Sequence, residues 1–255
     1  MPDEEFHNRT VLVTGGSRGI GRAICVRLAE TGARIAINYA GNEEAAQETL
    51  KMVTAAGATG AVFKADVSNL DAMKQMYAEI EDQLGPVDML VSNAGVARAG
   101  DKLDMSIEIW NEMMRVNLDG TFHAIWLAKD GMLARGFGRI VCMASVAGLA
   151  RNPLAADRLL AYGTSKAAVI GLSRNCAAAF APNVRVNCIA PGFIETDMTA
   201  NASEAGRKLL REATPLARLG KPEEIAEMAY FLLSDRSSYT TGQTVVASGG
   251  MVTLP

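Results

Sequence analysis

Two side chains in the second half of the chain have the types and the spacing needed to move a proton. Tyr162 and Lys166 are four residues apart in a segment with helical periodicity, so they share one face of a helix. A free phenol has a pKa of about 10, and a nearby ammonium lowers that value because it favours the phenolate. Such a tyrosine can donate or accept a proton near neutral pH. The alternative is an ordinary amphipathic helix with an exposed lysine.

Two further polar residues precede this pair. Ser145 directly follows a predicted strand, where its hydroxyl could hydrogen-bond a carbonyl oxygen on which negative charge develops. Asn117 lies within a long helical stretch, where its amide or a freed backbone group could hold a water that relays protons to Lys166. The four residues together predict an acid–base site.

A glycine-rich turn near the N-terminus predicts a binding loop for a pyrophosphate. An apolar strand ends at Thr14, and helical periodicity begins at Ile20. Glycine allows a tight turn and a close approach of the backbone, while the helix N-terminus supplies free N–H groups. The spacing G-x-x-x-G-x-G differs from the commoner G-x-G-x-x-G, so a plain glycine turn is the alternative. The candidate residues of this loop are Gly15, Ser17, Arg18, Gly19, Ile20 and Gly21.

The end of the second predicted strand indicates which dinucleotide fits. An acidic residue there would bind the adenosine ribose and repel a 2′-phosphate. The sequence has Asn38, Tyr39 and Ala40 instead, and no carboxylate before Glu43. Arg18 could contact a 2′-phosphate with its charged fork, or could be a solvated loop residue. The pattern favours NADPH/NADP over NAD(H).

Strand-like runs alternate with helical runs along the whole chain. The predicted strands are residues 10–14, 33–38, 60–64, 87–92, 138–144, 184–189 and 243–247. The predicted helices are residues 20–31, 43–56, 69–84, 106–134, 162–181 and 222–234. This pattern predicts one domain over residues 1–255, a Rossmann-type doubly wound α/β fold with a parallel seven-stranded sheet and helices on both faces.

Ligands in such sheets bind beyond the carboxyl ends of the strands. Asp66, next to Val67, could accept a hydrogen bond from an adenine amino group there, or could simply precede a helix. Asn93 could steady the end of the sheet or border the adenosine. Ala94 and Gly95 are small enough to let a cofactor lie close to the backbone.

Composition excludes several other classes of function. The chain has 255 residues and a net charge of −3, with no basic cluster, which argues against nucleic acid or an anionic membrane as a partner. No apolar run reaches about 18 residues and no signal-peptide pattern opens the chain, so we expect a cytoplasmic protein. Four scattered cysteines predict buried free thiols, and two histidines poorly supply a zinc site or a serine–histidine triad. We therefore predict no metal.

These motifs together resemble the short-chain dehydrogenase/reductase family over nearly the whole chain. The matching motifs are residues 14–21, Asp66-Val67, Asn93-Ala-Gly95, Asn117, Ser145, Tyr162-x-x-x-Lys166 and Pro191-Gly192. The resemblance implies that Asn117, Ser145, Tyr162 and Lys166 are the catalytic set, and that Tyr162 and Lys166 also contact the cofactor. It implies that Pro191, Gly192, Ile194 and Thr196 border the nicotinamide, and that a segment of about 190–215 covers the substrate.

Within the family, the closest similarity is to the 3-oxoacyl-[acyl-carrier-protein] reductases. It rests on residues 14–22, 38–42, 185–198 and Gly249-Gly250. It implies NADPH-dependent reduction of a 3-oxoacyl thioester or a related secondary-metabolite ketone. A sugar or polyol dehydrogenase is the alternative, and a non-catalytic NADP-binding regulator is disfavoured because all four catalytic positions are filled.

Family members usually pair two long helices between subunits, which implies a homotetramer. The corresponding stretches here are residues 106–134 and 162–181, with apolar positions that could face a partner subunit or their own sheet. These positions are Ile125, Leu127, Ile170 and Leu172.

Two features depart from the family pattern. Ser145 and Tyr162 are 17 residues apart, and the shorter spacing usual in the family implies an extra loop at about 150–160. Leu154, Leu159 and Leu160 of this loop could line a pocket or pack on the protein. The helix after Lys166 also lacks the usual charged residues at its end, although Arg135, Arg139 and Arg174 remain. Docking of an acidic acyl carrier protein is therefore in doubt, and a free or coenzyme A-bound ketone gains weight.

Overall fold

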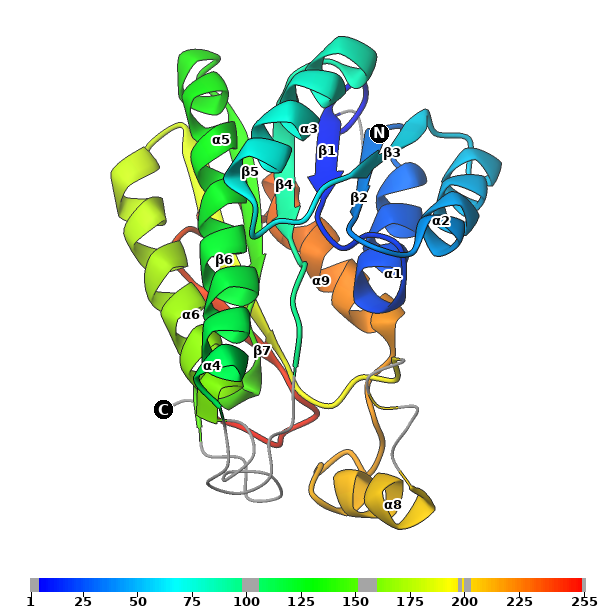
Figure 1. Ribbon diagram of the computed structural model, residues 1–255, viewed down its shortest axis with the longest axis vertical. Helices are drawn as coiled ribbons and strands as arrows, with labels where there is room; N and C mark the ends of the chain where they lie inside the picture. The colour runs from blue at the N-terminus through cyan, green and yellow to red at the C-terminus, as the bar shows by residue number, and fades with distance from the viewer. Residues whose placement is uncertain (1–4, 98–105, 151–159, 197–198, 200–202, 254–255) are drawn as a thin grey trace.

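A parallel sheet forms the centre of the molecule (Figure 1). The computed structural model describes residues 5–97, 106–150, 160–196, 199 and 203–253. Its seven strands lie in the order β3-β2-β1-β4-β5-β6-β7, and all neighbouring pairs are parallel. The strands are β1 (Thr10–Val13), β2 (Arg34–Tyr39), β3 (Gly60–Lys64), β4 (Val87–Ser92), β5 (Gly138–Met143), β6 (Val184–Pro191) and β7 (Thr244–Ala247). The predicted fold class is confirmed.

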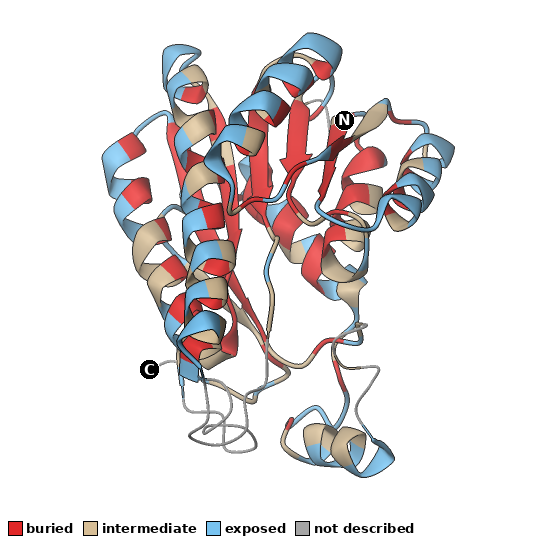
Figure 2. Cartoon of the chain, in the orientation of Figure 1, coloured by how far each residue is buried: buried red, intermediate tan, exposed pale blue. Residues whose placement is uncertain are grey.

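Helices cover both faces of the sheet. The helices are α1 (Gly19–Ala29), α2 (Glu43–Ala55), α3 (Leu70–Leu84), α4 (Ile107–Met113), α5 (Gly120–Ala134), α6 (Leu160–Phe180), α8 (Glu204–Glu212) and α9 (Pro222–Leu233). Helices α3, α5 and α6 share one apolar core with the sheet, and α1, α2 and α9 share the other. Because both faces are covered, β1, β4 and β6 are buried along their full lengths (Figure 2).

From β1 the chain adds β2 and β3 on one side of the sheet, and then β4 to β7 on the other side, so the strand order reverses between β1 and β4. A crevice forms at such a point, outside the carboxyl ends of the strands. Hydrogen bonds hold the two strand ends together: the Asn93 and Ala94 N–H groups both donate to Thr14 Oγ1, each at 3.0 Å. The predicted site residues after β1 and β4 therefore lie at one edge of the sheet.

Two elements differ from the sequence prediction. The helical stretch 106–134 is divided by a π-helical turn, η1 (Met114–Asp119), between α4 and α5. The segment expected to cover the substrate as a loop contains helix α8, which begins at the N-cap Ser203 and has Glu204 bonded to Arg211 at 2.9 Å. No residue of α8 is buried, and it projects away from the sheet (Figures 1 and 2). Its local charge pattern, not burial, supports the helix.

Candidate active site

The glycine turn after β1 has the backbone that close approach of an anion requires. Gly15 and Gly19 adopt positive φ angles of 62° and 54°. A Cβ on Gly21 would lie 2.2 Å from the Gly15 carbonyl oxygen, so no other residue fits there. Helix α1 follows the N-cap Arg18, which makes no side-chain cap, and its first turn carries no acidic residue. The first-turn N–H groups are therefore not capped by the N-cap side chain, which suits a pyrophosphate.

Two asparagine side chains hold the glycine turn in place through hydrogen bonds to its backbone. Asn38 is buried; its Oδ1 accepts from Gly15 N at 3.2 Å and its Nδ2 donates to Ala65 O at 3.0 Å. Asn93 Nδ2 donates to the carbonyl oxygens of Thr14 and Gly15 at 3.0 and 3.1 Å. Asn93 therefore steadies the end of the sheet, one of the two roles expected for it. Asn38 supports the loop with its side chain rather than presenting it to solvent.

The residues predicted to lie beside the adenosine follow β2 and β3. Tyr39 is buried, and burial, followed by the negative charge of Glu43 and a hydrogen bond to it, raises the pKa of its phenol. Ala40, the next residue, is exposed. Asp66 is exposed and its Oδ1 accepts from Ser68 N at 2.9 Å, so it closes the turn before α3. Asp66 thus lies in the turn before the helix, while the N-cap of α3 is Asn69, whose side chain accepts from Asp71 N and Ala72 N.

Ser145 and Tyr162 meet through close packing of the turn after β5 against α6. A Cβ on Gly148 would lie 2.6 Å from Ala167 N, and one on Gly163 would lie 2.8 Å from Ala147 O. Glycine at both positions allows this approach. Ser145 Oγ accepts from Ala147 N at 3.2 Å, and the hydroxyl donates a hydrogen bond to the Tyr162 phenol oxygen.

The pKa of Tyr162 moves in the direction opposite to the sequence expectation. Burial raises the pKa of the phenol above 10.0, and the hydrogen bond from Ser145 acts against this effect. Lys166 Nζ lies 5.8 Å from the centre of the Tyr162 ring and donates to Met143 O at 2.8 Å. The expected lowering of this pKa is therefore wrong in this structure: burial has the largest effect, and the hydrogen bond from Ser145, not Lys166, opposes it. Burial therefore favours the protonated phenol.

Lys166 is itself buried, with 4% of its surface exposed. Burial lowers the pKa of its amine from 10.5 to about 8. A Cβ on Gly95 would lie 3.3 Å from Lys166 Nζ and 3.1 Å from Asn117 Oδ1. The loop after β4, the π-helical turn and α6 therefore meet at one point, and Gly95 leaves the space for them.

The Asn117 side chain is fully used within the protein. Its Oδ1 accepts from Val96 N at 2.8 Å, and its Nδ2 donates to Val96 O and Ser165 Oγ, both at 3.0 Å. The side-chain amide is therefore not available to hold the predicted water. The Asn117 carbonyl accepts from Thr121 Oγ1 at 2.8 Å and has a second lone pair. Sequence reasoning missed Ser165, whose only signal is a hydroxyl residue between Tyr162 and Lys166.

The loop after β6 reaches across to the glycine turn. Gly192 N donates to Ala247 O at 2.9 Å, and its missing side chain lets Ser248 approach. A Cβ on Gly19 would lie 3.4 Å from Thr196 Cγ2, so the two loops face each other. Segments predicted to hold the pyrophosphate and the nicotinamide are therefore adjacent.

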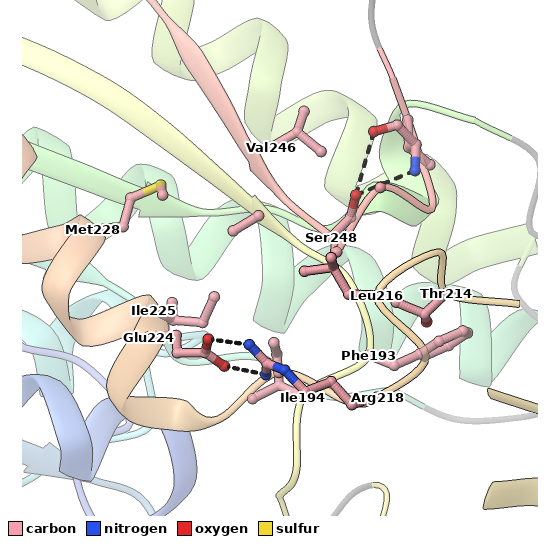
Figure 3. A pocket seen from close by; sticks show the side chains of 15 residues that line it. Phe193, Ile194, Thr214, Leu216, Arg218, Glu224, Ile225, Met228, Val246 and Ser248 are labelled. Carbon is pink, nitrogen blue, oxygen red and sulfur yellow. Dashed lines mark hydrogen bonds and ion pairs between the residues drawn. The ribbon is translucent and has the colours of Figure 1, made fainter. Parts of the chain in front are cut away.

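A cavity of about 410 Å³ lies behind this loop, between α9, β7 and the turn after α8 (Figure 3). Phe193, Ile225 and Val246 supply apolar wall, and Arg218 pairs with Glu224 through two hydrogen bonds of 2.8 and 2.7 Å. None of the four predicted catalytic residues lines it. Ile194, predicted to border the nicotinamide, does line it, so the cavity adjoins the loop after β6 and not the Ser145–Tyr162 pair.

Other sequence expectations have mixed outcomes. Of the predicted extra loop, residues 151–159, including Leu154 and Leu159, lie outside the described residues, and Leu160 is 61% exposed. Ile125 is completely buried and faces its own sheet, whereas Leu127, Ile170 and Leu172 are partly buried and pack against the core with part of their surface exposed. The large exposed apolar residues of α5 are instead Phe122, Trp126 and Leu133. All four cysteines are free and buried, as predicted.

Among the described residues, no group of three His, Cys, Asp or Glu side chains is arranged to hold a metal ion. No helix in the described part of the chain has both the length and the apolar character needed to cross a membrane.

Comparison with known proteins gives consistent matches. The family model described as enoyl-(acyl carrier protein) reductase matches residues 15–252. The 3-oxoacyl-[acyl-carrier-protein] reductase FabG of Staphylococcus aureus is 39% identical over 95% of this chain and 98% of its own length. The crystal structure of a 3-oxoacyl-[acyl-carrier protein] reductase from Brucella melitensis superposes with a TM-score of 0.89 at 35% identity, covering 98% of this chain and 93% of that one. A protein provisionally assigned as a gluconate dehydrogenase from Agrobacterium tumefaciens gives 0.91 at 30% identity, covering 98% of both.

Proposed function

The chain belongs to the short-chain dehydrogenase/reductase family, and from this premise we propose that it reduces the 3-keto group of an acyl thioester. It is an oxidoreductase, and its reductant is NADPH. The observation that carries the proposal is the hydrogen-bonded pair Ser145 and Tyr162, with Lys166 beside it, at the same edge of the sheet as the glycine turn.

The residues present fit the cofactor. The glycine turn and the uncapped start of α1 suit its pyrophosphate, and the absence of a carboxylate at Asn38, Tyr39 and Ala40 suits a 2′-phosphate, with Arg18 exposed nearby in sequence. Asp66, Val67, Ala94 and Gly95 would border the adenosine, and Ile194 and Thr196 the nicotinamide. When bound, NADPH supplies the hydride.

Each catalytic side chain has a separate role in the proposed reduction. When the substrate binds, the Ser145 hydroxyl turns its single proton from the Tyr162 oxygen to the substrate carbonyl oxygen and stabilises the charge that develops there. The Tyr162 phenol gives its proton to that oxygen; burial raises its pKa and so favours the protonated form from which it donates. The Lys166 amine binds the ribose hydroxyls, and Asn117 holds the loop after β4 in place.

The paired hydroxyls favour a ketone over an enoyl substrate, although the matching family model is named for enoyl reduction. Ser145 and Tyr162 together offer two donors to a single oxygen, which a carbonyl reduction uses fully. The two relatives named as 3-oxoacyl reductases support an acyl thioester as the substrate. A sugar or polyol is the second candidate, favoured by the likeness to the Agrobacterium protein.

The nature of the thioester carrier is less well supported. Arg135 pairs with Asp88 at 3.4 Å and Arg139 with Asp235 at 3.2 Å, so two of the three arginines left for an acidic carrier are already paired. The pairing of these two arginines supports a substrate that is free or bound to coenzyme A as an alternative to one bound to an acyl carrier protein. A homotetramer paired through α5 and α6 and a cytoplasmic location complete the proposal.

A screen of NADPH consumption tests the function. The substrates are acetoacetyl thioesters of coenzyme A and of acyl carrier protein, free β-keto esters, an enoyl thioester, quinones and sugars, each assayed also with NADH. We expect the 3-oxoacyl thioesters to be reduced fastest and NADPH to be preferred. Faster reduction of the enoyl thioester, or turnover of sugars alone, would refute the proposed substrate class.

A further inference from the structure

A buried chain of hydrogen bonds links the π-helical turn to the helix that carries Tyr162. Asn117 Nδ2 donates to Ser165 Oγ at 3.0 Å, and Ser165 Oγ donates to the main-chain carbonyl of Tyr162 at 2.8 Å. Both Asn117 and Ser165 have 0% of their surface exposed. The bond between these two side chains is buried, so solvent cannot replace it, and loss of the Ser165 hydroxyl leaves an Asn117 N–H without this acceptor.

The direction of this chain is fixed by the groups around it. Val96 N can only donate, so the Asn117 oxygen must face it and the Asn117 nitrogen must face Ser165. A hydroxyl has one proton, and because Ser165 Oγ accepts from Asn117, its own proton goes to the Tyr162 carbonyl. Bonds arranged in this order polarise one another.

The position of the link in α6 gives it a specific consequence. The helix begins at Leu160, so Tyr162 lies in its first turn. The N–H groups of a first turn have no partners within the helix, so this turn is held less firmly than the later ones. The Tyr162 phenol must meet Ser145, which stands on a different element, the end of β5. A small rotation of the first turn would separate them.

We propose that Ser165 is a positioning residue: by linking Asn117 to the Tyr162 carbonyl, it fixes the first turn of α6 and so holds the phenol against Ser145. This inference rests on the proposed function for its kinetic consequence, but the structural link can be tested without a substrate. Ser165 itself does not contact the reacting atoms.

The test compares three single variants of the full-length enzyme. Ser165→Ala removes the link, and Ser165→Thr keeps a hydroxyl. Ser173→Ala is the matched control, because Ser173 lies two turns further along α6, is 1% exposed, and faces the Cys142 thiol. The measurements are kcat and KM for NADPH and acetoacetyl thioester, the pH dependence of kcat, and hydrogen–deuterium exchange of the segment 160–166.

We expect Ser165→Ala to lower kcat by about tenfold or more, with KM for NADPH within about twofold of the wild type, because misplacement of a reacting group acts on the chemical step. The alkaline limb of the kcat profile moves to higher pH, because loss of the hydrogen bond from Ser145 raises the phenol pKa. Exchange in segment 160–166 rises. Ser165→Thr recovers most of kcat, and Ser173→Ala changes none of these quantities.

Several results would overturn the inference. These are a kcat for Ser165→Ala equal to that of Ser173→Ala, an unmoved pH profile, or Ser165→Thr as impaired as Ser165→Ala. If the wild-type enzyme reduces no 3-oxoacyl thioester, the proposed function fails instead. The exchange measurement then decides the link alone: equal protection of segment 160–166 in Ser165→Ala and Ser173→Ala refutes it.

Discussion

Replacement of Lys166 by methionine should make the protein more stable and inactive at once. The amine is buried, and its pKa falls from 10.5 to about 8 because burial disfavours the ammonium. That difference corresponds to a destabilisation of about 3 kcal/mol at neutral pH. Methionine has a similar length and no charge, but it leaves the Met143 carbonyl without its donor at 2.8 Å, which costs about 1 kcal/mol. The expected net gain is about 2 kcal/mol.

The stability gain of Lys166→Met depends on pH because the Lys166 amine has different pKa values in the folded and the unfolded protein. Because the folded pKa of about 8 lies below the unfolded value, the destabilisation by the ammonium is complete below pH 8. It disappears as the pH rises towards 10.5, the pKa in the unfolded chain. The gain in unfolding free energy of Lys166→Met over the wild type should therefore be largest at pH 6 to 7 and vanish near pH 10.5.

Urea unfolding at several pH values measures this difference. Lys74→Met is the matched control, because Lys74 is exposed on α3 and its ion pair with Asp71 contributes little. At pH 7 we expect the unfolding free energy of Lys166→Met to exceed that of the wild type by about 2 kcal/mol, which corresponds to a Tm gain of about 4–8 °C for a chain of this size. A variant less stable than the wild type at pH 7, or a difference that does not change with pH, would refute the reasoning.

Two further predictions test the glycine turn and the assembly. Gly21→Ala should abolish NADPH binding measured by fluorescence, because the alanine Cβ would lie 2.2 Å from Gly15 O. Gly41→Ala is the control and should bind NADPH normally, because nothing lies within 4 Å of the added Cβ. Equal NADPH binding by both variants would contradict the tight turn. Trp126→Glu should convert the proposed tetramer to smaller species in sedimentation velocity, since Trp126 is 49% exposed on α5, and a wild-type monomer at micromolar concentration would contradict the assembly.

The sequence was sufficient to predict the sheet because its strands are buried apolar runs separated by helices. The element bounds differ from the predicted ones by a few residues, for example β6 at Val184–Pro191 against 184–189. Helix α8 was missed because it is only nine residues long and none of its residues is buried, so its amphipathic pattern gives little signal of a core-facing element; its support is the set of charges around Glu204.

The roles of polar residues were harder to predict than their positions. The Asn38 and Asn117 amides are used by backbone groups that are distant in sequence, such as Ala65 and Val96, and only the fold brings these together. The pKa of Tyr162 was predicted in the wrong direction because the spacing to Lys166 says nothing about burial. Spacing identifies which side chains share a face, whereas their environment decides their protonation.

Tyr162→Phe tests the central claim, that this phenol delivers the proton, because it removes one oxygen and leaves the ring in place. We expect turnover of the best ketone to fall by about 10²–10⁴ while the dissociation constant for NADPH changes by less than about twofold, since general acid catalysis contributes that much and the ring packing remains. A variant that keeps more than about a tenth of the wild-type kcat with NADPH bound normally would contradict this role.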